Sequence, residues 1–401
     1  MQSFANFQNS NNLVNIFIIL LAISPAFALG DGNKNLLLIG AMCLSPYFLI
    51  RYPIILPQID VPLISICLMM IFFPMIFHPE TIRWSTILYS ILFCMFFMSF
   101  ARVLSFSNYS ADDFAKLIKW LLYAYCITLI IQQFCVLTGL PIFNLANYNP
   151  REPWKLNSLM AEPSHTARVQ TLLVFFYISI QMYITGTSNV KKILSHENKK
   201  VIAAFLYPIF TMGSGTGFFL LFILCLRFIP KKQVTSLFIA GLLLTPTITY
   251  IISTNDTAKR AANFVVAIAD FNEKQLIRED LSAAIRIVPT LHGAKEVTIF
   301  TKDGLFGKGV DADVGLTPLP SVDCGAGSFS IWYNFGFLTA TIFWCFTLFI
   351  CFLRKDMLMG LLFWLLLCFF YGGLNIQMIW FTLTLFLSYK YVIKDYAGNL
   401  G

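Results

Sequence analysis

Apolar residues recur along the chain in runs long enough to form membrane helices, and polar residues gather in the short segments between them. The runs lie near residues 13–30, 35–50, 61–77, 86–104, 117–140, 163–185, 200–212, 216–229, 234–252, 329–353, 357–371 and 375–393. About 20 apolar residues in a helix cross the hydrocarbon core of a bilayer. The pattern predicts an all-α integral membrane protein with about 12 transmembrane helices, in a single polytopic domain over residues 1–401.

The composition supports membrane insertion and argues against a nucleic-acid partner. The chain is 58% hydrophobic and only 12% charged, with a mean hydropathy of +0.73, whereas a soluble domain carries about 25% charged residues. The net charge of +8 comes from Lys and Arg in short connections, as the positive-inside rule expects. Because no basic face or nucleic-acid motif is found, we expect membrane lipid and not nucleic acid as the surroundings.

Two basic clusters set the topology in the middle of the chain. They lie at 191–200 and 227–232, and one apolar segment, "VIAAFLYPIFTMGSGTGFFLLFILCL" (201–226), separates them. Both clusters fall in the cytoplasm only if this segment is a hairpin broken at "GSGTG" (213–217). Each arm would then have about 12–13 residues, or roughly 18–20 Å of helix, which is short of the ~30 Å hydrocarbon core.

With this hairpin, every remaining basic cluster also falls inside. Both termini are then cytoplasmic, and two segments, about 141–162 and 253–328, face the outside. The longer segment is mixed in charge and is expected to be partly helical. Helical spacing predicts one helix in "DTAKRAANFVVAIADF" (256–271) and a second in "EDLSAAIRIV" (279–288), ending near Pro289.

Three ionisable residues, Glu162, His165 and Arg168, stand at the start of the sixth apolar run. One interpretation is structural, because a carboxylate at a helix N-terminus contributes roughly 0.3–1 kcal/mol. The other is a polar site, because His165 and Arg168 are three residues apart and share a helix face. Arg168 would lie about one turn into the membrane, where a charge is costly unless it faces a cavity or a partner.

Two further segments have the chemistry of an anion site. Arg151, just upstream, either anchors the chain at the interface beside Trp154 or contacts phosphate or sugar-acid groups. Ser214, Gly215 and Thr216 in "GSGTG" either break the helix for close packing or offer free N–H groups and hydroxyls to an anion.

The long outer segment contributes Arg260, Arg278, Arg286 and His292. Arginine binds phosphate with two parallel hydrogen bonds, although a single arginine is more often a solvated surface charge. Arg286 stands out because its helix is apolar. The four histidines are far apart and form no metal-ligand spacing, so no metal and no cofactor are expected.

Four motifs in this order resemble the O-antigen polymerase (Wzy-type) family, within the larger group that includes the O-antigen ligases. They are "REPWKLNSLMAEPSHTA", "TMGSGTGFFLLFIL", "SAAIRIVPTLHGAKEVTIFTKDGLFGKGVD" and "WYNFGFLTATIF", and together they cover about residues 150–340. The ligases have an arginine after the hairpin serine and a histidine before the last spans. This chain has Gly215 and Thr216 at the first place and "PSVDCGAGSFS" at the second, which favours a polymerase.

The resemblance implies a metal-independent, GT-C-like glycosyltransferase of the bacterial plasma (inner) membrane. Such enzymes transfer a glycan from undecaprenyl pyrophosphate to a sugar hydroxyl on the outer face, and a chain-length regulator and a flippase of the same pathway are candidate partners. The expected catalytic residues are Glu162, His165 and Arg286. The expected substrate-binding residues are Arg151, Arg168, Ser214, Gly215, Thr216, Arg260, Arg278 and His292.

Two alternatives stay open at this stage. A lipid-linked sugar flippase or other transporter would also have many spans and a broken helix, but it has no need of the long outer segment. The second alternative is an O-antigen ligase.

Overall fold

The computed structural model describes residues 2–27, 35–144, 153–187, 193, 196–213, 215–228, 266, 270, 273–279, 281–319 and 322–394. At a few helical positions within these ranges, Arg278 and Arg286 among them, only the backbone is described.

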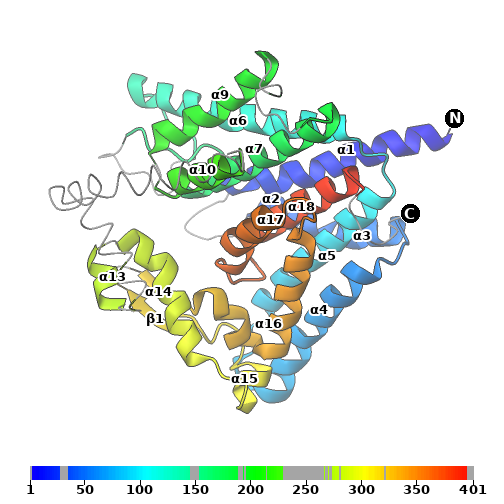
Figure 1. Ribbon diagram of the computed structural model, residues 1–401. Coiled ribbons are helices and arrows are strands. Elements are labelled where there is room, and N and C mark those ends of the chain that lie inside the picture. The colour runs from blue at the N-terminus through cyan, green and yellow to red at the C-terminus, as the bar shows by residue number, and fades with distance from the viewer. Residues whose placement is uncertain are drawn as a thin grey trace.

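Helices make up about three quarters of the described chain (Figure 1). In order they are α1 (Gln2–Ile23), η1 (Ser24–Phe27), α2 (Leu36–Cys43), α3 (Ser45–Arg51), α4 (Pro57–Phe77), η2 (Pro79–Thr81), α5 (Trp84–Ser105), α6 (Ala111–Thr138), α7 (Pro163–Thr185), α9 (His196–Met212), α10 (Gly215–Phe228), α13 (Glu273–Glu279), α14 (Leu281–Glu296), α15 (Lys302–Phe306), η3 (Gly327–Phe329), α16 (Ser330–Cys351), α17 (Met357–Trp364), η4, a π-helix (Leu365–Phe369), and α18 (Gln377–Val392). One antiparallel hairpin, β1 (Thr317–Leu319) with β2 (Val322–Cys324), interrupts them.

The apolar runs form helices throughout the described ranges, which confirms the prediction of a helical, multi-pass membrane protein. Within the described residues, six helical segments are long and apolar enough to cross a membrane: Ser10–Phe27, Pro57–Phe77, Trp84–Ser105, Ala111–Thr138, Pro163–Thr185 and Gly327–Cys351. The other predicted runs form shorter helices, except the run at 234–252, which lies outside the described residues. The count of twelve spans therefore stays a prediction.

Helix α16 breaks at Gly336, inside what the sequence predicts as one continuous span. Gly336 has φ 85° and ψ 166°, a backbone conformation that favours glycine. The break frees the carbonyls of Tyr333 and Asn334, and these accept hydrogen bonds from Lys308 N (2.8 Å) and Gly309 N (3.3 Å). The "LFGKG" turn after α15 thus supplies the donors that the helix has lost.

Helix α14 does not end near Pro289 as predicted, but runs to Glu296. Proline removes one backbone N–H from the helix, yet residues 326–328 contact the next turn and stabilise it. Thr290 Oγ1 lies 3.1 Å from Ser328 Oγ and accepts from Ser328 N at 3.2 Å. Gly293 packs so closely on Ala326 that a Cβ there would overlap the Ala326 carbonyl oxygen. These tertiary contacts hold the helix together across the proline.

Replacing Gly336 with alanine is expected to lower the thermal unfolding temperature of the purified protein. The new Cβ would overlap the Leu305 carbonyl oxygen, and a positive φ costs a non-glycine residue of order 1–3 kcal/mol. Gly40→Ala is the matched control, since Gly40 is helical and its Cβ would meet nothing within 4 Å. Equal unfolding temperatures for the two variants would contradict this account of the kink.

Helices α7 and α18 lie in the centre of the bundle. Residues 378–390 of α18 are all buried, and this helix contacts α1, α5, α6, α7 and α16. Figure 1 shows α13, α14 and α15 gathered beyond one end of the bundle, where α15 contacts α4 and α16. The described helices that follow α10, from α13 to α15, therefore lie at one end of the bundle.

At the opposite end of the bundle, the middle of α1 and the end of α18 are both bonded to the same turn. The turn between α5 and α6 makes both contacts: Tyr391 Oη donates to Ser107 O at 2.6 Å, and Tyr109 Oη donates to Asn15 Oδ1 at 2.6 Å. Burial, with a smaller contribution from the charge of Asp113, raises the pKa of Tyr109, so its hydroxyl remains a donor at neutral pH. The turn between α5 and α6 thus fastens the first described helix to the last one.

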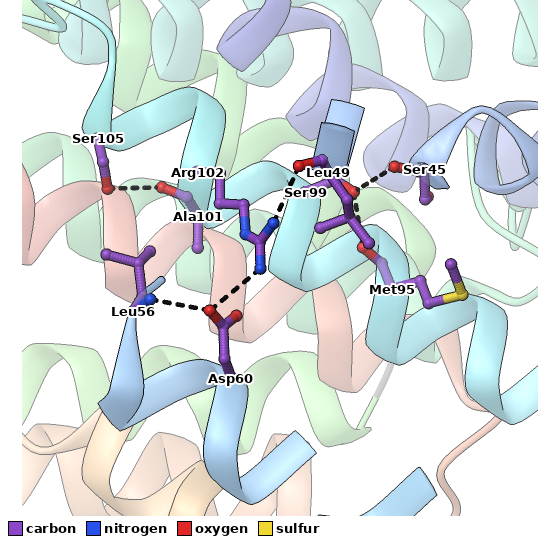
Figure 2. Close-up of polar contacts among 9 residues, drawn as sticks. All are labelled: Ser45, Leu49, Leu56, Asp60, Met95, Ser99, Ala101, Arg102 and Ser105. Atoms are coloured by element: carbon purple, nitrogen blue, oxygen red, sulfur yellow. Dashed lines mark hydrogen bonds and ion pairs between the residues drawn. The ribbon is translucent and has the colours of Figure 1, made fainter. Parts of the chain in front are cut away.

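An ion pair at this same end ties three helices together (Figure 2). Arg102 of α5 donates to Asp60 Oδ2 of α4 at 3.2 Å and to the Leu49 carbonyl of α3 at 3.0 Å. Asp60 also accepts from Leu56 N at 2.8 Å. Only 2% of the Asp60 side chain is exposed, so the carboxylate depends on these donors in place of water.

Candidate functional site

The start of α7 carries a partly exposed stripe on an otherwise enclosed helix. Glu162, His165 and Arg168 are half-buried, whereas Thr166, Ala167 and every residue from 169 to 180 are buried. Positions three apart lie on one helix face, so the three ionisable side chains share the accessible face. We call these three residues the α7 stripe.

Glu162 occupies the N-cap position of α7, but its carboxylate caps nothing. Its backbone is extended, with φ −146° and ψ 151°, and the side chain accepts no hydrogen bond from the first turn of backbone N–H groups. Its Oε2 instead accepts from Ser164 Oγ at 3.2 Å. The geometry therefore does not support the purely structural interpretation, and a half-buried carboxylate remains at the helix start.

Tyr371 meets the other two residues of the stripe. Arg168 Nη1 donates to Tyr371 Oη, and the guanidinium carbon lies 5.0 Å from the centre of the tyrosine ring. The His165 ring centre is 5.9 Å from the same ring, tilted by 59°. The sequence separation between Arg168 and Tyr371 is 203 residues, so only the fold brings them together.

Arg168 differs from the other partly buried arginines in having no acidic partner among the described residues. Arg102 and Arg227 each pair with an aspartate, at 3.2 and 2.6 Å. Tyr371 is a neutral acceptor, so it orders the Arg168 guanidinium without neutralising it. A cation in this setting is available to an anionic ligand.

Closely packed glycines connect the turn at Tyr371 to helix α14. Gly372 has φ 65°, and a Cβ there would overlap the Gly327 carbonyl oxygen. Gly327 has φ 56°, and its own Cβ would overlap Thr290. Thr290 lies one helical turn after Arg286. The turn beside the α7 stripe and the helix that carries Arg286 therefore both pack against residues 327–328.

The segment before the stripe is fastened to α6 by a buried polar network. Ser158 N donates to Gln132 Oε1 at 2.8 Å, and Ser158 Oγ donates to Tyr125 O at 2.6 Å. Thr166 Oγ1 donates to the Asn157 carbonyl. Ser158 lies four residues before Glu162 in the motif "REPWKLNSLMAEPSHTA", so its contacts hold the loop in place and thereby position Glu162.

The broken-helix hairpin lies beside α7. Helix α9 ends at Met212, Gly213 has φ 56°, and α10 begins at Gly215. Helix α9 packs on α6 and α7, and α10 packs on α7. Ser214 lies outside the described residues, and only the backbone of Gly215 and Thr216 is described. The predicted break is present, and its role as an anion site stays a prediction.

The structure describes the remaining predicted site residues, Arg151 and those of the long segment, to different extents. Arg151 and Arg260 lie outside the described residues, and Arg278 and Arg286 are described only as backbone of α13 and α14. His292 Nδ1 lies 4.0 Å from Glu273 Oε2, and Lys295 pairs with the same carboxylate. His292 therefore contributes to holding α13 against α14.

The sequence provides no signal for two buried or half-buried polar residues near the site. Tyr371 stands in an aromatic run, where it resembles an interfacial tyrosine. Gln170 of α7 is fully buried, and neither of its amide atoms has a hydrogen-bond partner in the described part of the chain. In apolar surroundings such an amide costs several kcal/mol.

The site offers on one face a carboxylate, an imidazole and a guanidinium that has no acidic partner in the described part of the chain. These groups can accept a proton and hold an anion without a metal. Within the described residues, no three His, Cys, Asp or Glu side chains gather as metal ligands. No protein-family model and no curated protein sequence matches this chain.

Proposed function

We propose that this protein is a polysaccharide polymerase of the O-antigen or capsule type. It would transfer a glycan from undecaprenyl pyrophosphate to the terminal sugar hydroxyl of a lipid-linked repeat unit. The proposal includes about twelve spans, cytoplasmic termini, an outer segment over 253–328 and a place in the bacterial inner membrane.

The observation that carries the proposal is the α7 stripe, whose arginine has no acidic partner among the described residues. Tyr371 and the contacts of Gly372 with Gly327 and of Gly327 with Thr290 connect the stripe to α14. A lipid-linked diphosphate sugar has an apolar tail, an anionic headgroup and a polar glycan. A membrane bundle that presents a half-buried carboxylate and a cation beneath an outer segment matches all three parts.

The groups suit transfer from a diphosphate. The acceptor hydroxyl oxygen attacks the anomeric carbon, the bond from that carbon to the diphosphate oxygen breaks, and the hydroxyl proton passes to a base. Glu162 is the leading base and His165 the second candidate. Arg168 and Arg286 would hold the charge that grows on the diphosphate as it leaves, and fixed cations stabilise such a transition state.

The glycan ladder of a deletion strain tests this function. A strain without the polymerase should attach a single repeat unit to lipid A core, or accumulate single lipid-linked units if the product is a capsule. Loss of every repeat unit from lipid A core would point to a ligase or a flippase. Ladders unchanged from wild type would overturn the proposal.

A tag inserted at Lys274 is expected to report the extracytoplasmic side of the membrane. The contacts between His78 and Gly307 (2.9 Å) and between Arg83 and Asp311 (3.5 Å) support this orientation. They join the outer segment to the end of α4 that is opposite the Arg102–Asp60 pair. The positive-inside rule places the Arg102 end in the cytoplasm, so the opposite end would face the outside. A tag at Lys355, in a basic connection, is the cytoplasmic control. A cytoplasmic Lys274 would exclude the catalytic arrangement and favour a transporter.

A further inference from the structure

We propose that Tyr371 is a positioning residue for the diphosphate, acting through Arg168. The inference rests on the proposed function and deepens it, because it assigns to a residue outside the α7 stripe the task of keeping the stripe's cation ordered and unneutralised.

The first argument is electrostatic. Arg168 lies about one turn into the membrane, where an unpaired charge is costly. An arginine in such a position usually forms an ion pair with a carboxylate. Arg102 and Arg227 both have one. Arg168 has the tyrosine hydroxyl and the nearby ring instead. An aspartate would compete with an incoming diphosphate for the guanidinium, whereas a neutral acceptor leaves the full charge for the ligand.

The second argument is mechanical. A flexible arginine loses side-chain entropy when it binds an anion, and a guanidinium already held in place loses less. Tyr371 can hold it because its own turn is rigid. The π-helix η4 ends just before it at Phe369, and Gly372 is locked against Gly327. Single π-helical turns often mark functional sites.

The third argument is spatial. Gly327 and Ser328, on which the Tyr371 turn rests, also pack on Thr290 of α14. The same backbone junction therefore sets the place of Arg168, through Tyr371, and of the helix that carries Arg286. Arg168 and Arg286, the two cations proposed to bind one diphosphate, would then both be positioned by residues 327–328.

A double-mutant cycle tests the inference. In full-length protein reconstituted in liposomes, elongation of a lipid-linked repeat unit is measured for wild type, Tyr371→Phe, Arg168→Gln and the double variant. Tyr371→Phe removes the acceptor oxygen and keeps the ring. In protein that keeps Arg168, this substitution should lower the elongation rate about tenfold, because a hydrogen bond to a charged group is lost. In the Arg168→Gln background it should change the rate less than twofold, because the two residues act as a unit.

The same cycle is measured on the binding of inorganic pyrophosphate to the purified protein, which does not depend on polymerase activity. Coupled losses of pyrophosphate affinity, with no elongation by wild type, would refute the proposed function and retain the role of Tyr371. Additive losses in both measurements would overturn the inference and leave the function standing.

Two further variants separate positioning from general stability. Tyr391→Phe is the matched control, since Tyr391 bonds to a backbone carbonyl at the other end of the bundle and should change elongation less than twofold. Tyr371→Leu should lower elongation more than Tyr371→Phe and show the same coupling to Arg168. Tyr371→Phe could instead lower the unfolding temperature and the activity equally in protein with Arg168 and in protein with Arg168→Gln. That result would overturn the inference.

Discussion

Glu162→Gln is expected to abolish long polysaccharide while the protein accumulates normally in the membrane. Glutamine keeps the shape of the side chain but cannot take the proton of the acceptor hydroxyl, and a positioned base contributes about 10²–10⁴-fold to rate. Stability should hardly change, because the carboxylate makes no cap to α7 and its described contact is a hydrogen bond from Ser164. Polymer length on a gel and elongation by reconstituted protein measure the effect.

The control for this prediction is Glu80→Gln. Glu80 is a carboxylate in the connection between α4 and α5, beside His78, which contacts Gly307, and 68% of its side chain is exposed. Its loss should leave chain length unchanged. His165→Gln identifies the second candidate base. Wild-type chain lengths in Glu162→Gln, with loss of polymer in His165→Gln, would transfer the role of base to His165.

Arg102→Leu is expected to cost about 3–5 kcal/mol of stability, because it leaves the Asp60 carboxylate buried without its cation. The carboxylate would keep the Leu56 N–H, and the Leu49 carbonyl at the end of α3 would lose its Arg102 donor. The variant should accumulate poorly in the membrane and unfold at a much lower temperature in detergent.

Arg51→Leu is the control for this ion pair, since it removes an exposed arginine at the end of α3. The double variant Arg102→Leu with Asp60→Leu should recover part of the loss, because no charge is then left unpaired. If Arg102→Leu and Arg51→Leu lowered the unfolding temperature equally, the buried pair would not hold the three helices together.

Local patterns determined the helices of this protein. A backbone in a bilayer must satisfy its own hydrogen bonds, so long apolar runs have to become helices, and the described runs do. The sequence also identified the α7 stripe, because an arginine within an apolar run needs a partner or a cavity. The break at "GSGTG" was predictable from the two basic clusters on either side of it.

Tertiary structure alone decided how the helices are broken and what the stripe meets. The kink at Gly336 and the continuation of α14 past Pro289 both depend on donors from distant segments, Lys308 N in one case and Ser328 N in the other. No periodicity within a helix contains such a signal.

The choice of Tyr371 as the partner of Arg168 has the same origin. The sequence contains many tyrosines in apolar runs and does not indicate which of them contacts Arg168. The close packing of Gly372 on Gly327 places Tyr371 there. The sequence by itself determined which residues are helical and where charge enters the membrane, because both follow from backbone hydrogen bonding and burial within each run. The assembly of those charges into a site was decided by close backbone approaches between segments that are far apart in the chain, which only the folded protein contains.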